Sequence, residues 1–287
     1  MNFLQPTTLA DLAQCLAQKP EEGGFLLAGC TDFLAQRNGK PWDARMLISL
    51  VNLPQLRLIQ LQDGFLSIGA ACTHAQTQAD PLIRTHFPAL AAACGNVGSQ
   101  QVRNRGTVGG NIANASPAGD IYPVFLVLGA RAVVLNSAGT KRILPMDELV
   151  LVSGKTSLAQ NEAIVSFQLP LPGTGCLNAF VKLGEQARIT IAKINLAASL
   201  ELENGLVRDA RLTLGAVAQR AFFSQACRVL VGQPLSRELL PSLYQALSQE
   251  IQGSIPNRAS MPYKRRAVKG LADDLLTELI RQARIPV

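Results

Sequence analysis

Two short stretches of the chain combine glycine with small polar residues, and the first of them directly follows an apolar segment. Residues 27–33 read LAGCTDF, and residues 107–114 read TVGGNIAN. A tight turn of Gly, Thr and Asn exposes several backbone N–H groups in one direction, and such a nest binds phosphate oxygens without a cationic side chain. Glycine is needed because a Cβ would keep a diphosphate away from the backbone. Two nests on separate segments could therefore hold the two phosphates of a dinucleotide.

The same stretches can be interpreted as ordinary turns, and the residues alone leave both interpretations open. Asn114 and Asp120, which flank the second stretch, favour a binding site. Other nucleotide-binding patterns are excluded. No G-x-G-x-x-G follows a predicted strand, as a Rossmann site requires. Residues 154–156 read GKT like the end of a P-loop, but Leu149 stands where that motif needs its first glycine.

Few side chains of the sequence could ligate a metal or act as a catalytic base. The six cysteines are at least 15 positions apart and form no C-x-x-C pair, so no local zinc or iron–sulfur site is expected. The only histidines are His74 and His86, which we expect to be structural or surface residues. We therefore predict no metal site in this chain and assign no catalytic side chain.

The composition is that of a folded globular protein. Of the 287 residues, 48% are hydrophobic and 16% are charged, and the net charge is +7. The basic residues are scattered apart from a KRR triplet at 264–266, which is typical of a solvated helix face, so no nucleic-acid partner is expected. The first residues lack a basic segment followed by an apolar one, and no apolar run is long enough to span a bilayer. We expect a cytoplasmic protein with reduced cysteines.

Apolar periodicity and turn residues predict helices and strands in alternation up to a proline-rich break. A helix is expected over residues 8–18, with Thr7 or Thr8 as its N-cap. Further helices are expected from residue 73 and over residues 81–94 and 122–129. Strands are expected over residues 25–28, 45–50, 56–61, 65–70, 131–135 and 161–169. The PLPG sequence at 170–173 is the expected domain boundary.

The rest of the sequence predicts a strand meander followed by helices. Strands are expected over residues 179–183, 191–203 and 207–217, with a hairpin turn at the NG pair of 204–205. Helices are expected over residues 221–232, 236–252 and 260–284. This order is typical of an α+β domain.

Several segments resemble the FAD-binding (medium) subunits of molybdenum hydroxylases, the xanthine dehydrogenase and carbon monoxide dehydrogenase family. LAGCTDFL (27–34) is similar to that family's AGGTDLL, and IGAACTHAQ (68–76) to its IGA-x-x-T-H segment. QVRNRGTVGGNIANASPAGDIYPVFLVLGA (101–130) matches its longest signature. FVKLGEQARITIAKINLAA (180–198) and NRASMPYKRRAVKGL (257–271) resemble two later segments. The resemblance covers almost the whole chain, in the same order.

The resemblance implies an α+β fold of two domains. Residues 1–172 would form an FAD-binding domain of the vanillyl-alcohol-oxidase type, with α+β subdomains of about residues 1–55 and 56–172. Residues 173–287 would form a smaller α+β domain of the carbon monoxide dehydrogenase flavoprotein type. FAD would lie between the two glycine stretches, which explains the missing Rossmann motif.

The resemblance also implies roles for individual residues. Ala113 and Asn114 would lie near the isoalloxazine ring, Asp120 would accept hydrogen bonds from sugar or ribityl hydroxyls, and Ile164 would pack near the flavin. Lys182 would place a cation near the ring. Cys30 stands where the family usually has glycine. The diphosphate and part of the ribityl chain would be enclosed by Leu27, Ala28, Gly29, Cys30, Thr31, Asp32 and Phe33 on one side and by Thr107, Gly109, Gly110 and Asn111 on the other.

The implied function is electron transfer within a larger complex. One partner subunit would carry the molybdenum cofactor and another the [2Fe–2S] clusters, and electrons would reach FAD here and pass to NAD⁺ or another acceptor. A dimer of heterotrimers is expected. One alternative is a flavin-binding relay or assembly module that turns over no acceptor of its own. A stand-alone flavin oxidase of the vanillyl-alcohol type is a weaker alternative, because these residues include no iron–sulfur or molybdenum domain.

Overall fold

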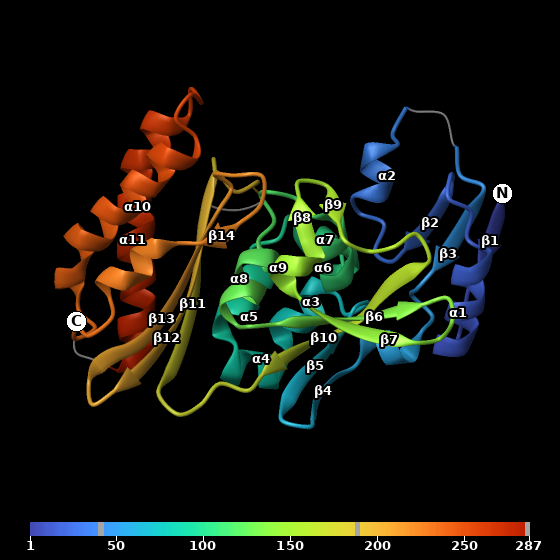
Figure 1. The fold of residues 1–287 in the computed structure, drawn as a ribbon, viewed down its shortest axis with the longest axis horizontal. Helices are drawn as coiled ribbons and strands as arrows, with labels where there is room; N and C mark the ends of the chain where they lie inside the picture. Colours follow the sequence, from blue (N-terminus) through green and yellow to red (C-terminus); the bar gives the residue numbers. More distant parts are fainter. Residues whose placement is uncertain (40–42, 187–189, 285–287) are drawn as a thin grey trace.

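The protein is described here by a computed structural model that covers residues 1–39, 43–186 and 190–284. Three sheets follow one another along the long axis of the molecule, and a group of short helices lies between the second and the third (Figure 1). The α+β class predicted from the sequence is confirmed.

The N-terminal lobe is a small parallel sheet with one helix packed on it. Its strand order is β1–β3–β2, and both pairs are parallel. Helix α1 begins at the predicted cap, where the Thr8 hydroxyl accepts a hydrogen bond from the Asp11 amide and the Asp11 carboxylate accepts one from the Thr8 amide. The elements of this lobe are β1 (Asn2–Leu4), α1 (Leu9–Gln18), β2 (Gly24–Leu27), α2 (Phe33–Gln36) and β3 (Met46–Ser49).

The central sheet has five antiparallel strands in the order β4–β5–β10–β6–β7. Along β10 the side chains alternate between two hydrophobic cores: Ala163 and Val165 pack toward the N-terminal lobe, and Ile164 and Phe167 pack toward the short helices. The sheet is therefore covered on both faces. Its strands are β4 (Ile59–Gln62), β5 (Phe65–Gly69), β6 (Arg131–Asn136), β7 (Lys141–Pro145) and β10 (Glu162–Pro170), and η1 (Pro54–Arg57) precedes it.

The short helices fill the space between this sheet and the C-terminal sheet (Figure 1). They are α3 (His74–Ala79), α4 (Pro81–His86), α5 (Pro88–Gly95), α6 (Gln100–Arg105), α7 (Val108–Asn114), α8 (Ile121–Val127) and α9 (Met146–Leu149). A small hairpin of β8 (Val150–Val152) and β9 (Lys155–Thr156) contacts α7.

The C-terminal sheet, β11–β12–β13–β14, is covered on one face by the two longest helices of the fold and on the other by α5 and α8 (Figure 1). Its elements are β11 (Cys176–Leu183), β12 (Ile194–Glu203), β13 (Leu206–Gly215), β14 (Phe222–Phe223), η2 (Gln225–Val229), η3 (Arg237–Leu239), α10 (Leu240–Ser254) and α11 (Met261–Ala283). The predicted turn at Asn204 and Gly205 is confirmed, with φ of 52° and 81°.

Three predicted elements are wrong, each for a local or tertiary reason. The helix expected over residues 81–94 is broken before Pro88, because proline has no N–H to continue α4. The strand expected from residue 56 begins at Ile59, after the turn that starts with Pro54. Residues 221–232 form β14 and a 3-10 turn in place of a helix. There Phe222 and Phe223 pair with β13, and Glu250 of α10 accepts hydrogen bonds from Ser224 and Ala226.

Candidate functional site

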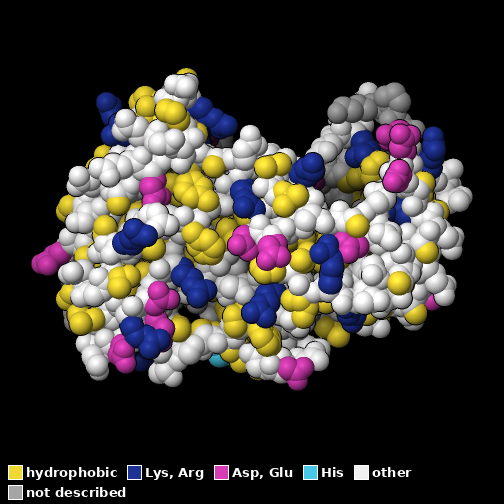
Figure 2. Space-filling view, viewed as in Figure 1, with side chains coloured by type: hydrophobic (Ala, Val, Ile, Leu, Met, Phe, Trp, Pro, Cys, Tyr) yellow, Lys and Arg dark blue, Asp and Glu magenta, His cyan; other side chains and the backbone are white. Residues whose placement is uncertain are grey.

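A groove of about 690 Å³ runs between the N-terminal lobe, α7 and the start of the C-terminal sheet. Figure 2 shows the molecule hollowed between the lobe that carries α2 and the central part. Small-molecule and cofactor sites typically occupy roughly 300–1,000 Å³. The groove is therefore large enough for a nucleotide-sized ligand.

The groove collects nearly all of the binding residues predicted from the sequence. Only Gly109 and Ile164 are absent from its lining, because each is buried in the core: Gly109 against Ala70, and Ile164 on the helix-facing side of β10. The predicted residues that line the groove are Leu27, Ala28, Gly29, Cys30, Thr31, Asp32, Phe33, Thr107, Gly110, Asn111, Ala113, Asn114, Asp120 and Lys182.

The first wall is the loop between β2 and α2. Its amide groups at Gly29, Cys30, Thr31 and Asp32 have no acceptor among the residues that the structure describes. Cys30 has a φ of 61°, a left-handed conformation that is unfavourable for a side chain with a Cβ. This is the position at which glycine was expected, so the loop keeps the backbone shape that a glycine would give. The predicted nest is compatible with this wall.

The first glycine stretch packs against the two residues that directly precede the second. A Cβ on Gly29 would lie 2.0 Å from the carbonyl oxygen of Arg105, which is closer than any real contact. Gly106 follows Arg105, and a Cβ there would lie 3.4 Å from the Thr31 hydroxyl. Gly29 is therefore required for the loop to pack against the residues that precede α7.

The second wall differs from the predicted turn. Residues 108–114 form helix α7, capped by the Thr107 hydroxyl, which accepts a hydrogen bond from the Gly110 amide at 3.1 Å. The amides of Val108 and Gly109 donate to the carbonyls of Cys72 and Ala70. These amides are occupied within the chain, so the expectation of a second amide nest is wrong. What this wall offers the groove is the exposed side of Gly110 and the side chains of α7.

Those contacts also explain the segment at residues 68–76. Its carbonyls receive the amides that start α7, Thr73 pairs with Thr107 in a β-bridge, and the His74 amide donates to the Gly106 carbonyl. The His74 side chain lines the groove, is 2% exposed and has no partner for Nδ1 within the described chain. Burial, with a smaller contribution from Arg103, lowers the pKa of His74 to about 4. His74 is therefore neutral at pH 7.

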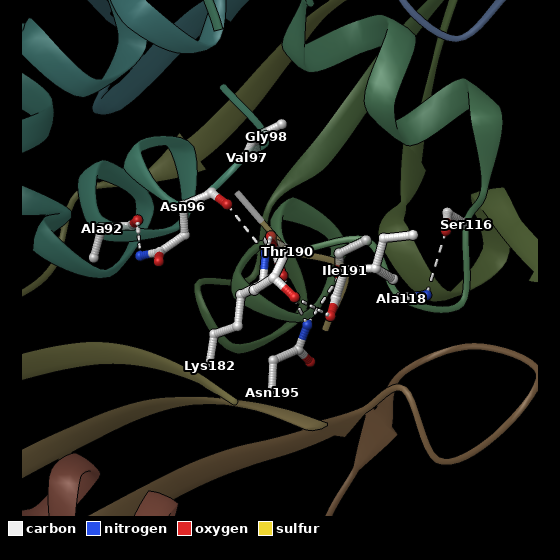
Figure 3. Close-up of polar contacts among 12 residues, drawn as sticks. Ala92, Asn96, Val97, Gly98, Ser116, Ala118, Lys182, Thr190, Ile191 and Asn195 are labelled. Carbon is white, nitrogen blue, oxygen red and sulfur yellow. Dashed lines mark hydrogen bonds and ion pairs between the residues drawn. The ribbon is translucent and has the colours of Figure 1, made fainter. Parts of the chain in front are cut away.

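A buried ion pair closes the far end of the groove. Lys182 of β11 donates to Asp120 at 2.5 Å and to the Asn96 carbonyl at 3.1 Å (Figure 3). Asn195 of β12 donates to the other Asp120 oxygen at 3.1 Å and to the Gly119 carbonyl at 3.2 Å. Burial raises the pKa of Asp120, and Lys182 and Asn195 partly offset that rise. The charge of Lys182 is therefore compensated within the chain.

Sequence reasoning missed several groove residues because they lie outside the glycine stretches. They include His74, Gln36, Arg37, Gly106, Thr190 and Ile191. His74, Gly106, Thr190 and Ile191 lay in segments that carry the family resemblance, but no binding role was assigned to them there, and Gln36 and Arg37 lay outside those segments. Arg37 directly follows α2, and nothing in its sequence neighbourhood distinguishes it from a surface arginine.

The described residues form neither a metal site nor a membrane-spanning helix. Within residues 1–39, 43–186 and 190–284, no cluster of His, Cys, Asp or Glu could hold a metal ion. The described helices include none that is both long and apolar enough to cross a membrane.

Comparison with known proteins agrees with this geometry. Residues 1–172 match the family described as FAD binding domain in molybdopterin dehydrogenase, and residues 179–279 match the CO dehydrogenase flavoprotein C-terminal domain. The xanthine dehydrogenase FAD-binding subunit of Escherichia coli O157:H7 is 30% identical, with 98% of this chain and 97% of that protein covered. The nicotinate dehydrogenase FAD-subunit of Eubacterium barkeri is 28% identical, with 98% and 96% covered.

Solved structures show the same fold over the full length. Quinoline 2-oxidoreductase of Pseudomonas putida 86 aligns with a TM-score of 0.88 and 25% identity, covering 99% of this chain and 98% of that one. Carbon monoxide dehydrogenase of Hydrogenophaga pseudoflava aligns with a TM-score of 0.85 and 25% identity, covering 97% and 96%. The chain therefore belongs to the family of FAD-binding domains of molybdopterin dehydrogenases, and a CO dehydrogenase flavoprotein C-terminal domain follows that domain.

Proposed function

We propose that this chain is the FAD-carrying subunit of a cytoplasmic, xanthine dehydrogenase-like molybdenum hydroxylase. It takes electrons from [2Fe–2S] clusters on one partner subunit and passes them to NAD⁺ or another acceptor. A further partner carries the molybdenum cofactor and hydroxylates the substrate, and the assembly is a dimer of heterotrimers. Residues 1–172 hold the cofactor, with subdomains of about residues 1–55 and 56–172, and residues 173–287 close its far end.

The observation that carries this proposal is the first wall of the groove. Four consecutive amides, from Gly29 to Asp32, have no acceptor in the described chain, and their residues line a groove of cofactor size. Oxygen atoms of a diphosphate would satisfy them. The residues present therefore fit FAD at this wall.

The other residues of the groove have separate tasks. Gly110 leaves the second wall open for the diphosphate and ribityl chain, because a Cβ there would meet only the Thr107 hydroxyl. Asp120 keeps lone pairs free for a sugar or ribityl hydroxyl beyond the two hydrogen bonds that it accepts. Ala113, Asn114, Thr190 and Ile191 also line the groove, and Figure 3 shows Thr190 and Ile191 beside Lys182. The remaining predicted residues, Gly109 and Ile164, support the walls from behind.

The bound cofactor supplies chemistry that the side chains lack: it can accept electrons singly and release them in pairs. The chain orients it, keeps water away from it and sets the charge around it. Since Lys182 is already paired with Asp120, the end of the groove that these two residues close carries a net charge close to zero. Lys182 acts on the bound ring through its position more than through a free positive charge.

Copurification tests this function. The full chain, expressed with its partner subunits, should yield a complex that contains flavin, molybdenum and iron. The chain alone, loaded with FAD, should show an oxidised flavin spectrum that bleaches when NADH is added without oxygen. A colourless chain that takes up no added FAD would contradict the proposal. If FAD binds and NADH does not bleach it, but partner subunits restore dye reduction, the chain is a relay without acceptor turnover.

A further inference from the structure

Arg37 is held at the edge of the groove by two aromatic rings. Its guanidinium carbon lies 4.3 Å from the ring centroid of Phe25 and 4.0 Å from that of Phe33, and the two rings are inclined at 65°. Phe25 lies on β2 before the first loop, and Phe33 lies in α2 after it. The rings that hold the guanidinium therefore stand at the two ends of the loop whose amides are unpaired.

The guanidinium has no counter-ion in the part of the chain that the structure describes. No carboxylate there lies within ion-pair distance of Arg37, and the N–H groups of its guanidinium make no hydrogen bond to the described residues. The acidic residue of this loop, Asp32, accepts a hydrogen bond from Gln36. Arg37 is half-buried and lines the groove, together with Thr31 and Asp32. A cation is thus fixed beside the nest with its donors unused.

The geometry limits what this cation can bind. The faces of a guanidinium stack on aromatic rings, whereas its N–H donors lie in the plane and form a fork that matches phosphate oxygens. Because the ring centroids of Phe25 and Phe33 are only 5.2 Å apart, the two rings lie on adjacent sides of the guanidinium and hold it in place without covering both of its faces. The remaining donors suit an anion. Because the side chain is held in place beforehand, binding costs less side-chain entropy.

We propose that Arg37 binds the diphosphate of FAD, beside the amides of residues 29–32. This inference rests on the proposed function and adds a cationic side chain to a site that was otherwise made of backbone. It assigns the N-terminal lobe a direct role in recognising the ADP half of the cofactor.

Binding measurements on the full-length apo chain test this. Arg37→Met keeps an apolar side chain against the rings and removes the charge. It should weaken FAD binding by roughly 10- to 100-fold, the effect of losing a hydrogen bond to a charged group. ADP competition should weaken similarly. Salt screens such a contact, so FAD affinity should depend less on KCl concentration in this variant than in the wild type. Arg37→Lys, which keeps the charge and loses the planar fork, should bind FAD with intermediate affinity.

Arg266→Met is the matched control. Arg266 is exposed on α11, away from the groove, and its loss changes the net charge equally. FAD affinity of this control within twofold of the wild type supports a local effect. The inference is overturned if Arg37→Met binds FAD within twofold of the wild type. A loss that is the same at every salt concentration also overturns it, because Arg37 would then only support the loop. A wild-type chain that binds no FAD contradicts the proposed function itself.

Discussion

Lys182 Nζ and Asp120 Oδ2 lie 2.5 Å apart, and the two side chains are 6% and 5% exposed. Lys182 belongs to the C-terminal sheet, and Asp120 is the N-cap residue of α8 in the preceding domain. The pair therefore joins the two parts of the chain at the end wall of the groove. Removing one member would leave the other charge buried.

Lys182→Met should destabilise the protein by about 3–5 kcal/mol, the usual cost of breaking a buried ion pair from one side. The double variant Lys182→Met/Asp120→Asn should recover much of this loss, since no buried charge remains. Urea unfolding of the single and double variants measures both effects. If the single and double variants are equally unstable, the packing of the Lys182 side chain contributes more to stability than its charge.

The same variant should change how stability depends on pH. Burial raises the pKa of Asp120, and loss of Lys182 should raise it further. A carboxyl with a raised pKa in the folded state stabilises the fold below its ordinary pKa, and this contribution is lost as pH rises through the folded value. The stability gap between Lys182→Met and the wild type should therefore be small at pH 4 and widen toward pH 7. A constant gap would exclude Asp120 ionisation as the cause.

Gly110→Val should prevent FAD retention while the protein stays folded, because the new side chain would enter the groove. Gly109→Ala should instead destabilise the fold. Its Cβ would lie 2.6 Å from the Ala70 carbonyl oxygen, so the fold would lose stability whether or not a ligand is present. The flavin content of the two variants as purified and the thermal melting of their apo forms distinguish the effects. Gly173→Ala, where a Cβ meets nothing within 4 Å, is the neutral control.

Cys30→Gly should relieve the left-handed strain at φ 61°. The strain costs about 1 kcal/mol, and the greater freedom of glycine in the unfolded chain cancels part of it, so a net gain of about 0.5 kcal/mol is expected. Cys30→Ala keeps the Cβ and removes only the thiol, so it should leave stability nearly unchanged. If the alanine variant gains as much stability as the glycine variant, the thiol and not the left-handed backbone is the source of the instability at Cys30.

Stability should fall on acidification because His74 is buried in its neutral form. The pKa of His74 is lowered to about 4 from an ordinary 6.5. A depressed histidine pKa gives stability that is complete above pH 6.5 and is lost as pH falls toward 4. A pKa shift of this size corresponds to a loss of about 3 kcal/mol. In apo His74→Gln this part of the pH dependence should disappear. Parallel pH profiles for the two proteins would contradict the assignment.

Much of the fold follows from local sequence features. Thr8 and Asp11 form the predicted cap of α1, and the NG pair at 204–205 forms the predicted turn. Prediction failed where a local preference was overridden. Pro88 divides a run that otherwise has helical composition. The residues near Phe222 are held in a non-helical conformation by pairing with β13 and by hydrogen bonds to Glu250, and these partners are distant in sequence.

The site shows a similar limit. Glycine can serve a ligand or a close packing contact, and the sequence does not distinguish the two. Gly110 faces the groove, whereas Gly109 and Gly29 are needed for contacts with Ala70 and Arg105. Arg37 was missed because its role depends on Phe25, which lies 12 positions before it and meets it only after the loop has folded.

The groove crosses from one domain into the other, and its two ends are encoded by separate parts of the sequence. The amide loop and Arg37 lie within the first 40 residues, whereas Lys182, Thr190 and Ile191 lie in the region that starts the C-terminal sheet. If FAD lies in the groove as we propose, substitutions in the later region reshape the surroundings of its reactive half and leave the contacts to its phosphates intact. A lineage can adapt such a subunit to new redox partners without first rebuilding its hold on the cofactor.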